Sequence, residues 1–288
     1  MNDFRLPIGE WVANGVDWIV TNWAGFFRFL RELLADMYNA VDWVFTTPPP
    51  LAVIAAIVIL ALLARGWRFA LGALVGLFVI LGVNQWNHAM DTLSLVIVAA
   101  AIAIVIAIPL GIAAAKSNVV SSIVRPVLDF LQTMPAFVYL IPALLLFRLG
   151  AAPGIVATII FAIAPGVRLT ELGIRGVDRE TVEAGASFGA TPGRILRQIQ
   201  LPLALPSIMA GINQVIMLSL SMVVIAGLVG AGGLGDQVIQ AMTRLDVKLG
   251  AEAGLSVVIL AMLLDRFTGS FGLRKGLFAK LRTPKPRA

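Results

Sequence analysis

The stretch EAGASFGATPGRILRQIQLP, from Glu183 to Pro202, decides how this chain is organised. It begins with a carboxylate and carries two arginines, Arg194 and Arg197, while the segments on either side of it are strongly apolar. Charged and polar groups are costly in the hydrocarbon of a bilayer. The stretch therefore predicts a polar loop between two membrane-spanning segments.

The residue types in this loop predict two short helices joined at an angle. Residues 178–188 are able to form the first helix, and Gly189 suits the left-handed backbone with which helices often end. Thr191 and Pro192 have the types preferred at the N-cap and the first position of a second helix. That helix is expected to stop at Leu201-Pro202, because the residue before a proline disfavours the helical region.

The spacing of these residues resembles the EAA loop of ABC importer permeases, written EAA-x3-G-x9-I-x-LP. One position departs, since Gly185 replaces the second alanine, and we expect it to loosen the first helix. The resemblance extends from about Trp86 to Arg266, where strings such as TMPAFVYLIPALLLF look like permeases of glycine betaine and proline betaine importers. In that family the loop docks into the ATPase, and the glutamate, here Glu183, fixes the first helix by hydrogen bonds or a charge pair. The residues that the resemblance assigns to ATPase coupling are Glu183, Ala184, Gly185, Gly189, Thr191, Pro192, Ile199, Leu201 and Pro202.

Composition independently indicates a membrane protein. Hydrophobic residues make up 59% of the 288 residues and charged residues only 13%, and the mean hydropathy is +0.93. Soluble domains carry roughly 25% charged residues, so this chain has too little polar surface to stay in solution. We predict an all-α membrane protein with about seven transmembrane helices. The expected spans are 50–64, 67–83, 92–115, 136–149, 154–169, 203–229 and 251–264.

The distribution of Lys and Arg predicts how these spans are oriented. If the loop 178–202 is cytoplasmic and the spans alternate, the N-terminus lies outside and the C-terminus inside, and 16 of the 22 basic residues fall on the inner side. Such an excess is typical of cytoplasmic loops. The six on the outer side are Arg5, Arg28, Arg31, Arg148, Arg244 and Lys248. We expect a multi-pass protein of the bacterial cytoplasmic (inner) membrane.

Four regions are expected along the chain. Residues 1–48 mix aromatic and charged side chains, which predicts amphipathic interfacial helices at the outer face. Residues 49–84 are expected to form two peripheral transmembrane helices, and residues 85–267 the permease core with the coupling loop 178–202. Residues 268–288 are a basic cytoplasmic tail, for which contact with anionic lipid is favoured over nucleic-acid binding.

The chain lacks the motifs of a catalytic or self-energised protein. No GxxxxGK[ST] phosphate loop occurs, so we expect no enzyme and no cofactor in this chain, with ATP and Mg²⁺ bound by a partner ATPase. There is no cysteine, and the single histidine, His88, lacks the neighbours of a metal site. No charged residue lies near the middle of an expected span, which argues against a secondary transporter.

Polar and aromatic residues in the spans mark a candidate translocation path. Polar groups in the long sixth span should face the bundle, another subunit or water, because lipid leaves them unpaired. Aromatic rings in the fourth span attract quaternary ammonium groups, although ordinary packing explains the same rings. The candidate path residues are Phe137, Tyr139, Asn213, Gln214, Met217 and Ser221.

The glycine-rich segment GAGGLG, residues 230–235, follows the sixth span at the expected outer face. A regular helix is costly for such a sequence, so we expect a tight turn or a close approach of two backbones. We interpret it as part of an outer gate. The gate residues are Gly230, Gly232, Gly233 and Gly235.

The resemblance implies a permease subunit with the type I ABC importer fold. In that family two copies pair with two ATPase subunits, and an external binding protein delivers the cargo. A quaternary-amine osmolyte is the expected cargo, and glycine betaine, proline betaine, choline, carnitine and trimethylamine N-oxide all remain open. The alternative is a membrane scaffold or sensor that uses an ATPase without moving solute.

Overall fold

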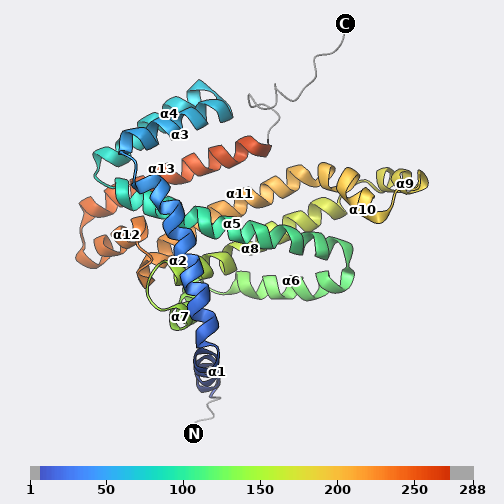
Figure 1. Ribbon diagram of the computed structural model, residues 1–288, viewed down its shortest axis with the longest axis horizontal. Helices are drawn as coiled ribbons and strands as arrows, with labels where there is room; N and C mark the ends of the chain where they lie inside the picture. Colours follow the sequence, from blue (N-terminus) through green and yellow to red (C-terminus); the bar gives the residue numbers. More distant parts are fainter. Residues whose placement is uncertain (1–6, 273–288) are drawn as a thin grey trace, which may run out of the picture.

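The computed structural model describes residues 7–272, and every regular element in that range is helical, as the sequence predicts (Figure 1). The elements are α1 (Ile8–Asn22), α2 (Ala24–Thr46), α3 (Pro50–Arg65), α4 (Trp67–Gly82), α5 (Trp86–Lys116), α6 (Asn118–Thr133), α7 (Ala136–Phe147), α8 (Ala151–Arg175), α9 (Arg179–Ser187), α10 (Pro192–Ile195), a π-helical turn (Leu196–Gln200), α11 (Leu201–Ala226), a 3-10 turn (Gly227–Val229), α12 (Gly233–Arg244) and α13 (Val247–Gly272). Residues 1–6 of the expected interfacial region and residues 273–288 of the expected basic tail lie outside the described range.

The centre of the bundle is α8, which packs between α5 and α11. Small residues allow the three helices to approach closely. A Cβ built on Gly166 would lie 2.8 Å from Cβ of Ala107 on α5 and 2.9 Å from Cγ2 of Val215 on α11. Membrane helices associate through such small-residue contacts, because lipid supplies no hydrophobic driving force between them.

The described helices supply up to about seven candidate membrane spans, which is consistent with the predicted number. Four helices are each long and apolar enough to span a bilayer, namely α5, α8, the combined α10–α11 segment and α13. Two bent helix pairs, α2–α3 and α6–α7, pass the same test together, and α4 is a shorter apolar helix. With one span from each bent pair, up to six segments of the described residues pass this test, and α4 would be a seventh.

The expected fourth span, 136–149, is wrong. Helix α7 has only 12 residues and turns by 100° from α6, and α6 runs back along the bundle in its place (Figure 1). Helix α6 is not among the expected spans. It contains the charged residues Arg125 and Asp129. In the fold Arg125 is ion-paired to Glu171 and Asp129 to Arg168, both on α8, so these charges are neutralised although their side chains stay partly exposed.

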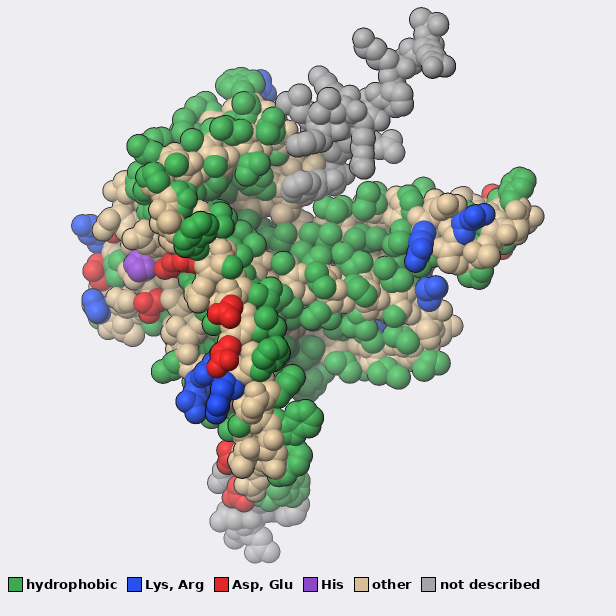
Figure 2. All heavy atoms as spheres, viewed as in Figure 1, with side chains coloured by type: hydrophobic (Ala, Val, Ile, Leu, Met, Phe, Trp, Pro, Cys, Tyr) green, Lys and Arg blue, Asp and Glu red, His purple; other side chains and the backbone are tan. Residues whose placement is uncertain are grey.

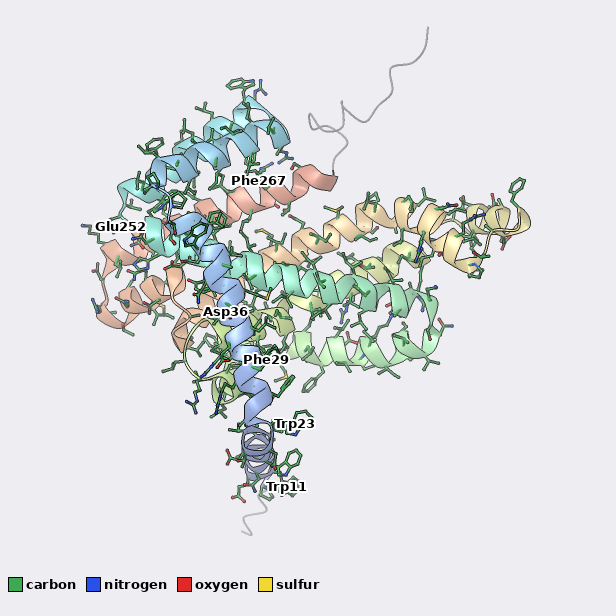
Figure 3. The ribbon with its side chains drawn as sticks, in the orientation of Figure 1. Trp11, Trp23, Phe29, Asp36, Glu252 and Phe267 are labelled. Carbon is green, nitrogen blue, oxygen red and sulfur yellow. The ribbon has the colours of Figure 1, made fainter. Side chains whose placement is uncertain are left out.

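The two short helices α3 and α4 lie at the edge of the bundle against α13 (Figure 1). Gly66, with φ of 93°, makes the turn between them. Phe69 of α4 meets Phe267 of α13 edge to face, with ring centroids 5.0 Å apart (Figure 3). That residues 49–84 form two peripheral transmembrane helices stays a prediction.

Helix α2, the second helix of the chain, crosses the bundle helices instead of running along them (Figure 1). It is turned by 96° from α3 and buries Leu34 against the main core. Figure 2 shows hydrophobic side chains on one side of the α1–α2 segment and charged ones on the other. A helix of this kind suits the interface of a membrane, and the outer-face position of residues 1–48 stays a prediction.

Candidate functional site

The loop 178–202 forms the two helices expected of it, at the end of the bundle marked by α9 and α10 in Figure 1. Asp178 caps α9, because its side chain accepts a hydrogen bond from the Glu180 N–H at 3.0 Å. Gly189 has φ of 78° and ends the helix in the left-handed conformation. Thr191 and Pro192 occupy the N-cap and first positions of α10, and the Thr191 carbonyl, not its hydroxyl, accepts the capping hydrogen bonds.

The second helix does not stop at Leu201-Pro202, so that expectation is wrong. It continues from α10 through the π-helical turn into α11, forming one segment of 38 residues from Pro192 to Val229. Pro202 lacks an N–H, and its ring crowds the carbonyl four residues back. We attribute the wider turn directly before it to that crowding, and such π turns occur often at functional sites.

Helix α9 packs against the second helix of the loop at Gly185. A Cβ built there would lie only 2.5 Å from Cδ1 of Ile199, so the isoleucine packs directly over the glycine. Ile195 and Leu196 are buried beside this contact. Helix α9 runs without a break through Gly185, and the missing side chain makes room for Ile199. That Gly185 loosens the helix stays a prediction.

The outer surface of this protrusion carries Glu183, Ala184, Thr191 and Pro192, all exposed. Among the described residues the Glu183 carboxylate has no hydrogen bond and no ion pair, and its expected role in fixing the first helix stays a prediction. The sequence reading missed Phe188, which is 93% exposed at the tip of the protrusion. A large apolar residue directly before the turn glycine is the signal that could have found it.

A buried carboxylate joins the base of the protrusion to the bundle. Glu171 of α8 is 3% exposed and accepts hydrogen bonds from Ser121 Oγ at 2.7 Å and Arg125 Nη2 at 2.9 Å, both on α6. Arg175 pairs with the same carboxylate at 3.0 Å and donates to the Ala114 carbonyl of α5 at 2.7 Å. The sequence reading missed this cluster, although the spacing of Glu171 and Arg175 by four residues favours an ion pair on a helix.

Three candidate path residues share one face of α11. Gln214 and Ser221 are exposed and Met217 is half-buried between them, and their spacing of three and four residues places them on one side of the helix. A polar stripe on a membrane-spanning helix has reason to face a water-filled path or another subunit.

Asn213 lies on a different side of α11 from that stripe. Its amide donates to Asp265 Oδ1 of α13 at 3.2 Å, and its carbonyl accepts from the Thr268 hydroxyl. These bonds tie α11 to α13, so the structure shows Asn213 as a packing contact within the bundle.

The two aromatic candidates of α7 also point to different surroundings. Phe137 is exposed, whereas Tyr139 is buried with its ring 6.3 Å from that of Phe161 on α8. Tyr139 belongs to the same buried apolar cluster as Leu220 and Met222 of α11.

The glycine-rich segment is a turn only in its first half. Gly230 and Gly232 have φ of 72° and 83°, whereas Gly233 already begins α12. The expectation that the whole segment avoids a helix is therefore wrong. The missed helix places its first turn against α5, where the buried Leu234 N–H donates to Thr92 Oγ1 at 2.7 Å.

The close backbone approach expected of this segment is present. A Cβ on Gly235 would lie 2.4 Å from the Val224 carbonyl oxygen, and one on Gly227 would lie 2.4 Å from the carbonyl carbon of Gly235. The end of α11 and the start of α12 thus touch backbone to backbone, which only glycines permit.

Residues 107–274 match the family model described as the inner membrane component of binding-protein-dependent transport systems. The chain is 47% identical to the glycine betaine/carnitine transport permease protein GbuB of Listeria monocytogenes, with 92% of this chain and 95% of that protein covered. It is 44% identical to the glycine betaine/proline betaine transport system permease protein ProW of Escherichia coli, with 93% of this chain and 75% of that protein covered.

The fold is also similar to a solved structure of the methionine ABC transporter MetNI in an inward-facing conformation. The TM-score is 0.60 at 22% sequence identity, with 65% of this chain and 94% of that chain covered. The chain therefore belongs to the family of binding-protein-dependent transport system inner membrane components and is a permease with the fold of type I ABC importers.

Proposed function

We propose that this permease moves a betaine or another quaternary-amine osmolyte into the cell at the expense of ATP. The observation that carries the proposal is the protrusion of α9 and α10, whose turn requires Gly189 and whose tip exposes Phe188. Similar permeases are named as transporters of glycine betaine, proline betaine, carnitine and trimethylamine N-oxide. This likeness supports the same class of cargo here, and choline remains in the panel to be tested.

The protrusion would act as the contact with a separate ATPase, which binds ATP and Mg²⁺. Two copies of this chain would pair with two ATPase subunits, and an external binding protein would deliver the cargo. Closure of the ATPase dimer on ATP would move the protrusions and turn the path outward. Hydrolysis would return it to the inward-facing state.

The proposal is tested by uptake into vesicles that contain the permease and its ATPase. Radiolabelled glycine betaine, proline betaine, choline, carnitine and trimethylamine N-oxide are each offered with the binding protein. We expect accumulation of at least one of them that requires both ATP and the binding protein. ATP hydrolysis without accumulation of any of these solutes would instead support the scaffold or sensor.

The stripe on α11 supports a dimer of this chain about an axis along the membrane normal. Gln214 and Ser221 are exposed in the single chain, and a second copy would shield them from lipid. We expect a single cysteine at Met217 to cross-link between copies in at least one nucleotide state. A cysteine at Leu172, exposed on α8, is the matched control. Complexes whose mass contains a second, different permease would contradict the homodimer.

The proposed orientation places α9 in the cytoplasm and α12 outside. The chain has no cysteine, so single cysteines can be placed at exposed Ser187 of α9 and exposed Thr243 of α12. In intact cells we expect a membrane-impermeant maleimide to label T243C and to spare S187C. Permeabilised cells should show labelling of both, and the reverse pattern in intact cells would overturn the orientation.

A further inference from the structure

Three arginines gather where the α1–α2 segment passes the end of α7. Arg28 and Arg31 lie on α2, and Arg148 is the residue that ends α7. They line a pocket of about 210 Å³ that also has apolar walls, which include Phe27 and Leu145. The pocket therefore combines a cationic rim with an apolar interior.

None of these three guanidinium groups has a carboxylate within 4.0 Å among residues 7–272. By contrast, Arg125, Arg168 and Arg175 at α6 and α8 are all ion-paired. Like charges that converge without a counterion repel each other, and guanidinium groups bind phosphate with paired hydrogen bonds. The arrangement favours an anionic ligand.

The backbone of Arg148 supports a ligand site at this place. Its φ of 61° and ψ of −170° lie in a region that is essentially restricted to glycine. The surroundings hold it there, because its N–H donates to the Leu144 carbonyl at 2.8 Å. Strained residues of this kind cluster at ligand-binding sites, and here the strain fixes where the third guanidinium projects.

The neighbouring surface indicates where the ligand comes from. Trp23, Phe26 and Phe29 of α2 are more than half exposed, and Figure 3 shows Trp11 and Trp23 projecting from the same side of the α1–α2 segment. Basic side chains gather on the opposite side of α2 (Figure 2). Exposed aromatic residues next to a charged edge are typical of the headgroup level of a bilayer.

We propose that this pocket binds the phosphate of an anionic phospholipid, in the leaflet opposite the α9–α10 protrusion. The three arginines would hold the phosphate, and the apolar walls would accept the adjoining glycerol and acyl carbons. A quaternary-amine cargo does not fit, because its ammonium group would be repelled by the arginines. The site is thus separate from the proposed transport path, and its occupancy does not depend on which solute is moved.

The test uses the full-length chain in detergent and native mass spectrometry with phosphatidylglycerol or phosphatidylcholine of the same acyl chains. The variant R28Q/R148Q removes one guanidinium from each segment. The control R244Q/K248Q removes the same charge from exposed residues of α12 and α13 outside the pocket. We expect R28Q/R148Q to bind phosphatidylglycerol about tenfold more weakly than the native chain, and the control to bind it normally.

Phosphatidylcholine binding and the melting temperature should be equal in all three proteins, which would show that the fold is intact. Unchanged phosphatidylglycerol binding by R28Q/R148Q, or an equal loss in the control, would overturn the proposal. Inorganic phosphate or glycerol 3-phosphate forms a further arm. If either displaces phosphatidylglycerol at equal concentration, the pocket is a site for a soluble phosphate and not for a lipid. Preferential displacement by an acidic peptide would likewise assign the arginines to a protein partner.

Discussion

Replacing Gly189 with valine is expected to abolish coupled transport while the protein still inserts into the membrane. Gly189 has φ of 78°, and nothing lies within 4 Å of the position that a Cβ would take, so the cost is conformational and not a clash. Left-handed backbone costs an L-residue roughly 1–2 kcal/mol and a β-branched one more. Each 1.4 kcal/mol changes a population about tenfold, so the native turn should become a minor conformation.

The measurement is uptake together with binding-protein-stimulated ATPase activity in proteoliposomes, and both should fall in parallel by about tenfold or more. Gly193→Val is the matched control, because Gly193 lies on the same protrusion with open space around it and an ordinary φ. It should leave both activities close to the native values. Normal uptake by Gly189→Val would contradict the requirement for this turn.

The second large effect is expected at Glu171, whose substitution by glutamine should destabilise the folded protein. The buried carboxylate satisfies Arg125, Arg175 and Ser121 at once. Only the carboxylate is buried, whereas Arg125 and Arg175 are partly exposed and solvent screens their charges. We therefore expect a loss of about 1–3 kcal/mol, mainly from the lost hydrogen bonds to a charged group. We expect a clear drop in the SDS concentration needed for unfolding, followed by tryptophan fluorescence.

Glu180→Gln is the control for this prediction, because Glu180 is an exposed carboxylate on α9, where a lost charge is worth little. The double variant E171Q/R125Q should regain part of the stability, because it removes a positive charge together with the carboxylate. If Glu171→Gln unfolds at the same SDS concentration as Glu180→Gln, the cluster does not stabilise the bundle.

Those parts of the fold that are decided by residues close together in the chain could be predicted from the sequence. The turn at Gly189, the start of α10 at Pro192 and the bounds of α3 and α4 follow from local residue preferences and hydropathy. The glycine-rich segment 230–235 was also identified as a place of close backbone approach. In these cases a few residues decide the local conformation.

Several of the errors arise where distant segments meet. Helix α6 is absent from the expected spans, and its Arg125 and Asp129 find their partners on α8, about 40 residues further along the chain. The first turn of α12 is anchored by Thr92, which lies 142 residues before Leu234 in sequence. The exposure of Phe188 likewise depends on how α9 stands out from the bundle. Residue preferences within a short window carry none of this information.

The continuous helix from Pro192 to Val229 has a mechanical consequence. Its 38 residues form a rod about 57 Å long at 1.5 Å per residue, with the protrusion at one end and the glycine turn at the other. Near its middle, a Cβ on Gly211 would lie 3.4 Å from Cα of Gly166 on α8, so that contact can serve as a fulcrum between two arms of nearly equal length. A tilt that carries Pro192 inward by a few ångströms should carry Val229 by a similar distance in the opposite direction. Paired spin labels at the two ends, each measured against α8, would record these opposite displacements. Movement of only one end would contradict a tilt about the contact of Gly211 with Gly166.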